Sequence, residues 1–212
     1  MRVRKKKNTA RRLEAVKNYL IPDIGETAGK HGGVSLYVEI GCGKGGFITS
    51  LAQKNPHKSF IAIEKISDII VMAAEKAAAA EIPNLKFAAA DAKNFGSFFS
   101  ANEASKIFIN FCDPWPGNRH EKRRLTSPGF LGKYKNALET GGELAFKTDD
   151  RDLFVYSKKQ IEKFFEITKI SEDLRGELSV DDREKDEYYT TEYEEKFSSR
   201  GQKIYFILAV KE

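Results

Sequence analysis

The chain has 212 residues, of which 41% are hydrophobic, and its 36 Lys and Arg exceed its 31 Asp and Glu by five. This length suits one domain with a substantial core, and two cysteines do not support a disulfide framework. The sequence holds no run of about 20 apolar residues of the kind that spans a membrane. We therefore expect a cytoplasmic protein with no membrane association. The three histidines show no spacing typical of a metal site or a catalytic triad.

The first 33 residues form a basic region that precedes the catalytic domain, which we expect at residues 34–212. We predict an arm up to Asn8, a helix over Thr9–Leu20 and a Pro- and Gly-rich link over Pro22–Gly33. Every charged residue before Glu14 is basic. Such a segment suits contacts with RNA phosphates, and the alternative is a solvated tail.

The segment after the link has the pattern of a nucleotide-binding strand, turn and helix. The run Ser35–Ile40 predicts a strand, and a helix begins at Gly46. Gly41, Gly43 and Gly46 satisfy the spacing G-x-G-x-x-G, whose glycines let the backbone approach a ligand and let the helix pack on the strand. The motif has low specificity by itself, so the ligand has to be inferred from the charges around it.

Glu39 lies inside this first strand, where a buried carboxylate is costly unless it has a partner. It would repel the pyrophosphate of a dinucleotide, whereas S-adenosylmethionine carries an ammonium and a sulfonium and no phosphate. The charge of Glu39 therefore favours S-adenosylmethionine at the glycine turn. The alternative is that Glu39 accepts hydrogen bonds from backbone N–H groups of the turn.

A second acid, Glu64, follows the predicted strand Ser59–Ile63. It lies about 20 residues after the turn, where folds of this type bond a ribose hydroxyl. Lys65 supports a different ligand, a dinucleotide with a 2′-phosphate that the ammonium would meet. Glu64 itself fits either ligand.

A third acid, Asp91, follows a predicted helix over Ser67–Ala80 and a predicted strand over Leu85–Ala89. A carboxylate only accepts hydrogen bonds, and the exocyclic amine of adenine is a donor. Asp91 is therefore a candidate adenine contact. The alternative is a cap for the turn that contains Lys93 and Asn94.

The most informative segment is Asp113-Pro-Trp-Pro, directly after the apolar run Ile107–Phe111. The run predicts a buried strand, so the acid and the indole lie at its carboxyl end, where open α/β sheets bind ligands. An aromatic ring beside a carboxylate suits a nucleobase held by its face and its edge. A rigid turn with Trp115 packed in the core is the alternative.

The remaining pattern continues the alternation of helices and strands. We predict helices over Pro128–Leu138 and Arg151–Phe165 and strands over Gly142–Lys147, Glu166–Ile170 and Lys203–Val210. The last two strands are separated by a long acidic stretch, Glu172–Glu195. We expect this stretch to be a mobile loop that serves the substrate.

The sequence from about Ser35 to the C-terminus resembles the bacterial tRNA (guanine-N7)-methyltransferases. The resemblance rests on the glycine turn and on four further motifs, which are Asp113-Pro-Trp-Pro, His120-Glu-Lys-Arg-Arg-Leu125, Phe146-Lys-Thr-Asp149 and Thr191-Glu-Tyr-Glu194. It implies an α/β fold of the Rossmann-like class I S-adenosylmethionine-dependent methyltransferases, with a mostly parallel sheet and an antiparallel edge strand. It also implies methyl transfer to N7 of a guanosine in the variable loop of tRNA.

The resemblance also implies roles for individual residues. Asp113 matches the catalytic residue of the family. The cofactor-binding positions are Glu39, Gly41, Gly43, Glu64, Asp91 and Asp113. The substrate-binding positions are Asp149, Thr191, Glu192, Tyr193 and Glu194. The family usually has Lys where this chain has Gly117, and we expect Arg119, Lys122, Arg123 or Arg124 to supply the missing charge, with Arg119, Arg123 and Arg124 as substrate-binding residues for tRNA.

The chemistry of guanine limits what Asp113 would do. N7 carries a lone pair and no proton, so methyl transfer requires alignment more than a base. A carboxylate would instead accept from N1–H and N2–H and leave N7 free. Two alternatives remain, an NAD(P)-dependent oxidoreductase and a noncatalytic RNA-binding protein that uses the same glycine turn. We expect tRNA as partner, no required protein partner, and a monomer or homodimer.

Overall fold

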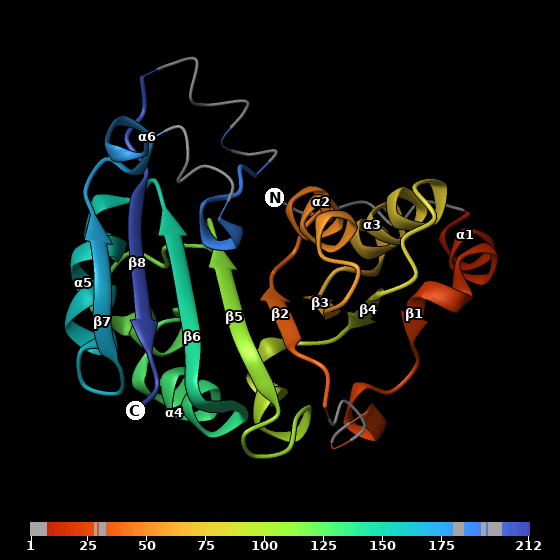
Figure 1. The fold of residues 1–212 in the computed structure, drawn as a ribbon, viewed down its shortest axis with the longest axis horizontal. Helices are drawn as coiled ribbons and strands as arrows, with labels where there is room; N and C mark the ends of the chain where they lie inside the picture. The colour runs from red at the N-terminus through yellow and green to blue at the C-terminus, as the bar shows by residue number, and fades with distance from the viewer. Residues whose placement is uncertain (1–7, 28, 30–32, 180–184, 192–193, 195–200) are drawn as a thin grey trace.

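The computed structural model describes residues 8–27, 29, 33–179, 185–191, 194 and 201–212 (Figure 1). The basic residues at positions 2–7, together with Glu192 and Tyr193, lie outside the described residues. No helix within the described part of the chain is long and apolar enough to cross a membrane.

Within the described residues, eight strands form one sheet in the order β1-β4-β3-β2-β5-β6-β8-β7 (Figure 1). The strands are β1 (Leu20–Ile21), β2 (Leu36–Ile40), β3 (Ser59–Glu64), β4 (Leu85–Ala89), β5 (Ala104–Asn110), β6 (Leu138–Thr148), β7 (Glu166–Ser171) and β8 (Tyr205–Val210). β8 runs antiparallel to both β6 and β7, and the other pairs are parallel. The predicted α/β fold with a mostly parallel sheet is confirmed. The antiparallel strand is β8, which lies next to the edge strand β7.

Helices cover both faces of the sheet, which explains why the central strands are apolar on both sides. On one face lie α2 (Gly46–Lys54) and α3 (Ser67–Ala79), and on the other α4 (Pro128–Ala137) and α5 (Arg151–Ile161) (Figure 1). Two separate clusters of buried apolar residues result, one on each face.

The chain between β7 and β8 provides the cover that a helix would otherwise give to β5, β6 and β8 on the α2 side. It contains the short helix α6 (Leu174–Glu177) and a 3₁₀ helix, Asp186–Tyr188. Tyr188 packs edge-on against Phe206 of β8 at 5.3 Å between ring centroids. The described part of this stretch therefore packs on the core, and the expectation of a mobile loop is wrong for it.

The N-terminal helix is shorter than predicted. α1 (Thr9–Ala15) ends five residues before Leu20, which is already part of β1 and pairs with Phe87 of β4. The edge of β4 offers unpaired backbone groups, and pairing them outweighs the helical pattern of the sequence. Arg12 holds α1 on α3 through two hydrogen bonds to Glu75, at 2.7 and 2.5 Å.

Candidate cofactor and substrate site

The turn between β2 and α2 has the backbone that its glycines predict. Gly41 has φ of +76°, and its N–H donates to the carbonyl of Ile63 at 2.8 Å, which joins the turn to β3. Gly45 has φ of +72°, and a Cβ there would lie 2.7 Å from the Cβ of Ala73. Gly45 therefore lets the start of α2 approach α3 closely.

Glu39 is buried, with 3% of its surface exposed, on the face of β2 that α2 covers. The side-chain N–H of Asn110 donates to Oε1 at 3.0 Å, while Oε2 has no hydrogen-bond partner among the described residues. Burial raises the pKa of this carboxyl to about 7, and the hydrogen bond from Asn110 and the charge of Lys147 limit the rise. Glu39 is thus a buried acid with one oxygen open to a donor.

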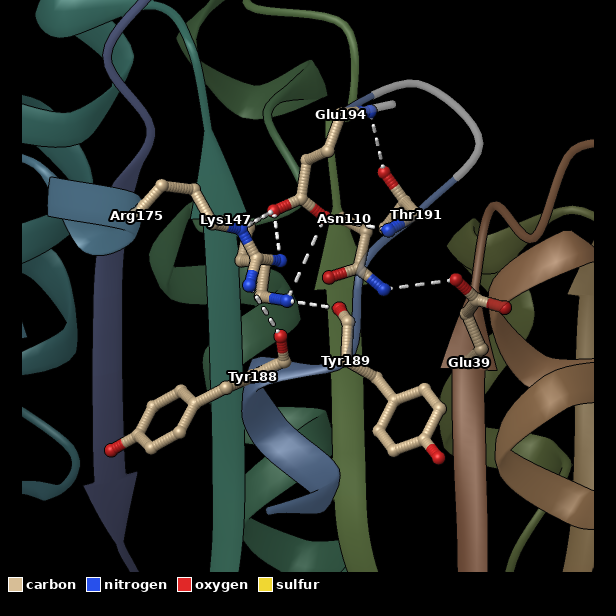
Figure 2. A network of polar contacts seen from close by, with 8 residues as sticks. All are labelled: Glu39, Asn110, Lys147, Arg175, Tyr188, Tyr189, Thr191 and Glu194. Atoms are coloured by element: carbon tan, nitrogen blue, oxygen red, sulfur yellow. Dashed lines mark hydrogen bonds and ion pairs between the residues drawn. The ribbon is translucent and has the colours of Figure 1, made fainter. Parts of the chain in front are cut away.

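Asn110 and Lys147 are functional candidates that the sequence reading missed. They are paired across β5 and β6, and they share the face of Glu39 because Glu39 is paired with Phe108, two residues before Asn110. Figure 2 shows the side chains of Glu39 and Asn110 pointing toward each other from neighbouring strands. The Oδ1 atom of Asn110 also has no partner among the described residues. Each of these two neighbouring side chains therefore has one buried acceptor without a donor among the described residues, and the two acceptors lie on opposite sides of the hydrogen bond that joins the side chains (Figure 2).

Glu64 and Asp91 both accept backbone hydrogen bonds. The Glu64 oxygens accept from the N–H groups of Gly43 at 3.2 Å and Ile66 at 2.9 Å. Asp91 accepts from the N–H of Lys93 at 3.0 Å, so the capping alternative for Asp91 is confirmed.

Lys65, the residue that supported a dinucleotide phosphate, pairs with Asp91 at 2.7 Å. This hydrogen bond and that from Lys93 lower the pKa of Asp91. Lys65 and Asp91 thus form an ion pair in which Lys65 is largely exposed, while carboxylate lone pairs remain on Asp91 and Glu64.

A cavity of about 380 Å³ brings three of the four predicted acids together. Glu64, Asp91 and Asp113 line it, and Glu39 immediately precedes the lining residues Ile40 and Gly41 in the chain. Its apolar wall is formed by residues at strand ends and from helices α3 and α4 and the chain beside them, which are Ile63, Ile66, Ile69, Phe111, Leu125 and Phe130. Three carboxylates together with apolar surface suit a nucleoside.

Asp113 is exposed at the rim of this cavity and accepts no hydrogen bond from any described residue. The segment that follows Asp113 is held by Arg124, whose guanidinium donates to the carbonyls of Pro114 at 3.2 Å and Trp115 at 3.2 and 3.3 Å. Arg119 is exposed and donates to His120 at 3.0 Å. Asp113 is therefore free to bind a ligand, whereas the guanidinium of Arg124 is bonded to the backbone of Pro114 and Trp115.

The predicted substrate motif at the C-terminal side is folded into the protein. The backbone N–H of Thr191 donates to Oε2 of Glu194 at 2.7 Å, and the backbone N–H of Glu194 donates to Oγ1 of Thr191 at 3.0 Å. This reciprocal pair has the pattern of a helix capping box. Asp149, at the end of β6, accepts from Gln202 at 2.9 Å. Glu192 and Tyr193 stand between the two bonded residues in sequence, outside the described residues.

Glu194 is fully buried and joins this motif to β6 (Figure 2). Arg175 donates to its Oε1 at 2.5 and 3.0 Å, and Lys147 Nζ lies 3.8 Å from its Oε2. Lys147 is only 1% exposed and also donates to the carbonyl of Tyr189 at 2.6 Å. Lys147 therefore lies between the Thr191–Glu194 motif and the acid Glu39.

Comparisons with known proteins agree on the type of fold and of enzyme. The family model described as "Putative methyltransferase" matches residues 34–207. The tRNA (guanine-N(7)-)-methyltransferase of Clostridioides difficile (strain 630) is 42% identical over 97% of this chain and 96% of its own, and that of Streptococcus mutans serotype c is 39% identical over 99% of each. A solved structure of a SAM-dependent methyltransferase from Aquifex aeolicus superposes with a TM-score of 0.59 at 11% identity, covering 98% of this chain and all of the other.

Proposed function

This chain belongs to the tRNA (guanine-N7)-methyltransferase family, and from that premise we propose that it transfers a methyl group from S-adenosylmethionine to N7 of a guanosine in the variable loop of tRNA. The family gives the reaction and the class of RNA.

The orphaned acceptors on Glu39 and Asn110 carry the proposal. A ligand that meets either acceptor has to bring a hydrogen-bond donor, and a positive charge beside Oε2 would relieve the cost of burying Glu39. The ammonium of S-adenosylmethionine has both properties. The phosphates of NAD(P) have neither, and Lys65 is already bound to Asp91. This contrast favours methyl transfer over hydride transfer.

The rest of the cofactor fits the cavity beside Glu39. We assign the ribose hydroxyls to the free lone pairs of Glu64 and the adenine amine to Asp91, with the backbone of Gly41 and Gly43 against the ligand. The bound cofactor supplies an electrophilic methyl group. The protein supplies orientation and an enclosed surface, because alignment is what this substitution requires.

Asp113 is the residue we assign to the guanine. Its carboxylate accepts from N1–H and N2–H, which turns N7 toward the cofactor, and it stabilises the positive charge that the purine acquires. Asp149 lies near the same edge of the sheet and is a second proposed contact. Glu192 and Tyr193 remain proposed contacts, and we assign to Thr191 and Glu194 the positioning of that segment, because both are buried.

The basic surface beside Asp113 is the proposed contact for tRNA phosphates. Arg119, Lys122 and Arg123 are exposed on the 3₁₀ helix Asn118–Arg123, which follows the Asp113 segment. The match of the family model from residue 34 onward supports the division between a basic N-terminal region and the catalytic domain. We further propose that the enzyme works in the cytoplasm, as a monomer or homodimer, on tRNA alone.

The variants Asp113→Ala and Asp113→Asn test the assignment of Asp113. Both should lose turnover on unmodified tRNA, because neither side chain can accept from N1–H and N2–H together. Thermal stabilisation by S-adenosylhomocysteine should persist, since Glu39, Glu64 and Asp91 remain. Wild-type turnover in Asp113→Ala would remove Asp113 from the site. Stabilisation of the wild-type protein by NADP and not by S-adenosylhomocysteine would instead favour the oxidoreductase.

A further inference from the structure

Trp115 is held at the rim of the cavity in an unusual backbone conformation. Its φ is +45°, in the left-handed region that bulky residues avoid, and it lines the cavity together with Asp113. The guanidinium of Arg124 bonds the carbonyls on both sides of this strained residue. Because strain of this kind persists only where neighbouring contacts impose it, the indole has a fixed position beside the proposed guanine contact.

A flat cation already lies on the face of this indole. The guanidinium carbon of Arg123 is 3.4 Å from the ring centroid of Trp115. Arg123 is exposed, and it forms no ion pair with any described residue. The stack on Trp115 is thus the contact that orients the guanidinium, and it demonstrates that the ring face is open to a planar, positively charged group.

The product of the proposed reaction is such a group. The N7 lone pair of guanine forms a bond to the methyl carbon while the bond from sulfur to that carbon breaks, and the electron pair of the broken bond returns to sulfur. The sulfonium becomes a neutral thioether, and its positive charge passes to the purine, with no proton lost. The purine is therefore neutral before transfer and a planar cation after it.

We propose that Trp115 is the stacking platform for the target guanine, and that its π face stabilises the charge that develops on the purine during methyl transfer. Arg123 occupies the same face in the free enzyme and leaves it when the base enters. This inference rests on the proposed function. Because the attraction between a cation and the ring grows as the charge forms, it stabilises the transition state more than the bound substrate.

The occupant of the platform is the substrate and not the adenine of the cofactor. Asp91, the proposed adenine contact, follows β4, whereas Trp115 follows β5, and β3 and β2 lie between these strands in the sheet. Asp113, the proposed guanine contact, precedes Trp115 by two residues. Asp91 and Trp115 thus follow strands that are not neighbours, and we assign them to different rings.

Fluorinated tryptophan provides a test that preserves the shape of the site. Trp115 is the sole tryptophan in the sequence, so biosynthetic incorporation of 5-fluorotryptophan or tetrafluorotryptophan changes this ring alone. Fluorine withdraws electron density from the π face and so weakens the attraction of the ring for a cation. We expect the single-turnover rate of methyl transfer to tRNA to fall progressively, by about threefold to tenfold for the tetrafluoro ring, while the affinities for tRNA and S-adenosylhomocysteine stay unchanged.

The emission of the same tryptophan identifies the group on the platform. Unmodified tRNA should quench it, and S-adenosylhomocysteine alone should not. Quenching by S-adenosylhomocysteine alone, or an unchanged transfer rate in the tetrafluoro enzyme, would overturn the role of Trp115 and leave the proposed function intact. If the unsubstituted enzyme transfers no methyl group to tRNA, the proposed function fails, and the platform fails with it.

Discussion

Glu39 is the residue whose ionisation we expect to govern both stability and cofactor binding. Its pKa is raised from 4.5 to about 7, so between these values the folded protein holds a proton that the unfolded chain has lost. Stability contributed by this group is therefore lost as pH rises from about 4.5 to 7. A cationic ligand binds the ionised form, so cofactor binding should release this proton.

We predict that the affinity for S-adenosylhomocysteine rises by about tenfold between pH 6 and pH 8, following the ionised fraction of Glu39. In Glu39→Gln the affinity should be low and independent of pH over this range. The ligand-free variant should also lose the decline in thermal stability that the wild type shows over the same interval. Calorimetric titration and thermal unfolding at both pH values measure these effects.

Glu143→Gln is the matched control, because Glu143 is a carboxylate on β6, two strands away from β2, that pairs with Lys106 and does not line the cavity. It should keep the pH dependence of the wild type. A wild-type affinity that does not change between pH 6 and pH 8 would mean that Glu39 does not meet the cofactor in its ionised form.

The sequence allowed some of these residues to be predicted and not others. Glu39 could be predicted because an acid inside an apolar strand needs a partner. Asn110 and Lys147 could not, because their nearness to Glu39 depends on the register of three strands that are far apart in sequence. Their only signal is that each is a polar residue ending an apolar strand. The backbone of Trp115 likewise depends on Arg124 and has no local signature.

At the scale of elements, the chain between β7 and β8 takes the place of a covering helix. It is fastened at several points, among them the ion pair of Lys58 with Asp186 at 2.6 Å and the bonds of Lys147 and Arg175 to Glu194 and to backbone carbonyls. Since Lys147 also faces Glu39, this element and the cofactor site share one buried charge.

Lys147→Met should therefore have two effects. The substitution removes one of the positive charges that offset the buried carboxylate of Glu194, and it should therefore reduce the free energy of unfolding by about 3 kcal/mol. It should also raise the pKa of Glu39 further, so the rise in affinity for S-adenosylhomocysteine should move to higher pH. Chemical denaturation and titration across pH measure the two effects.

Lys106→Met is the matched control, because Lys106 is an equally buried lysine on β5 that pairs with Glu143. It should lower stability without moving the pH profile. If both variants have the same profile, Lys147 has only a structural role.

The elements themselves were largely predictable. β2, β3, β4 and β5 follow from apolar runs that end in Gly, Pro or acidic residues, since strands buried on both faces have this composition. β1 was missed because its two residues, Leu20 and Ile21, are too few to show the alternation of apolar and polar residues that indicates a strand. Their pairing also depends on β4, which is distant in sequence. The packing of residues 174–191 could not be predicted, because their few apolar residues, such as Leu174 and Tyr188, are dispersed among charges.

At the scale of the whole molecule, the site forms where the strand order reverses. β2 lies between β3 and β5, so the segments that leave these strands diverge and form a crevice at their carboxyl ends. The glycine turn, Glu64 and Asp113 all lie there, and the basic 3₁₀ helix Asn118–Arg123 continues the surface outward. The position of this helix suggests how the backbone of a large RNA is held while one base enters the crevice.

The double variant Arg119→Ala, Lys122→Ala should weaken tRNA binding and make it less sensitive to salt. The plot of log affinity against log salt should become shallower by about two units, one for each lost phosphate contact. Filter binding of tRNA between low and moderate salt measures the slope.

Lys159→Ala, Lys163→Ala removes the same charge near the far end of α5 and should leave the slope unchanged. Equal slopes in the two double variants would place the tRNA on another face of the molecule.

Methyl transfer to unmodified tRNA from S-adenosylmethionine labelled in its methyl group tests the central claim most directly. We predict that label enters the tRNA and that borohydride and aniline, which cleave at N7-methylguanosine, cut the product at a guanosine of the variable loop. Label that fails to enter the tRNA, or that enters without creating this cleavage, would contradict the account, provided that the same preparation binds S-adenosylhomocysteine.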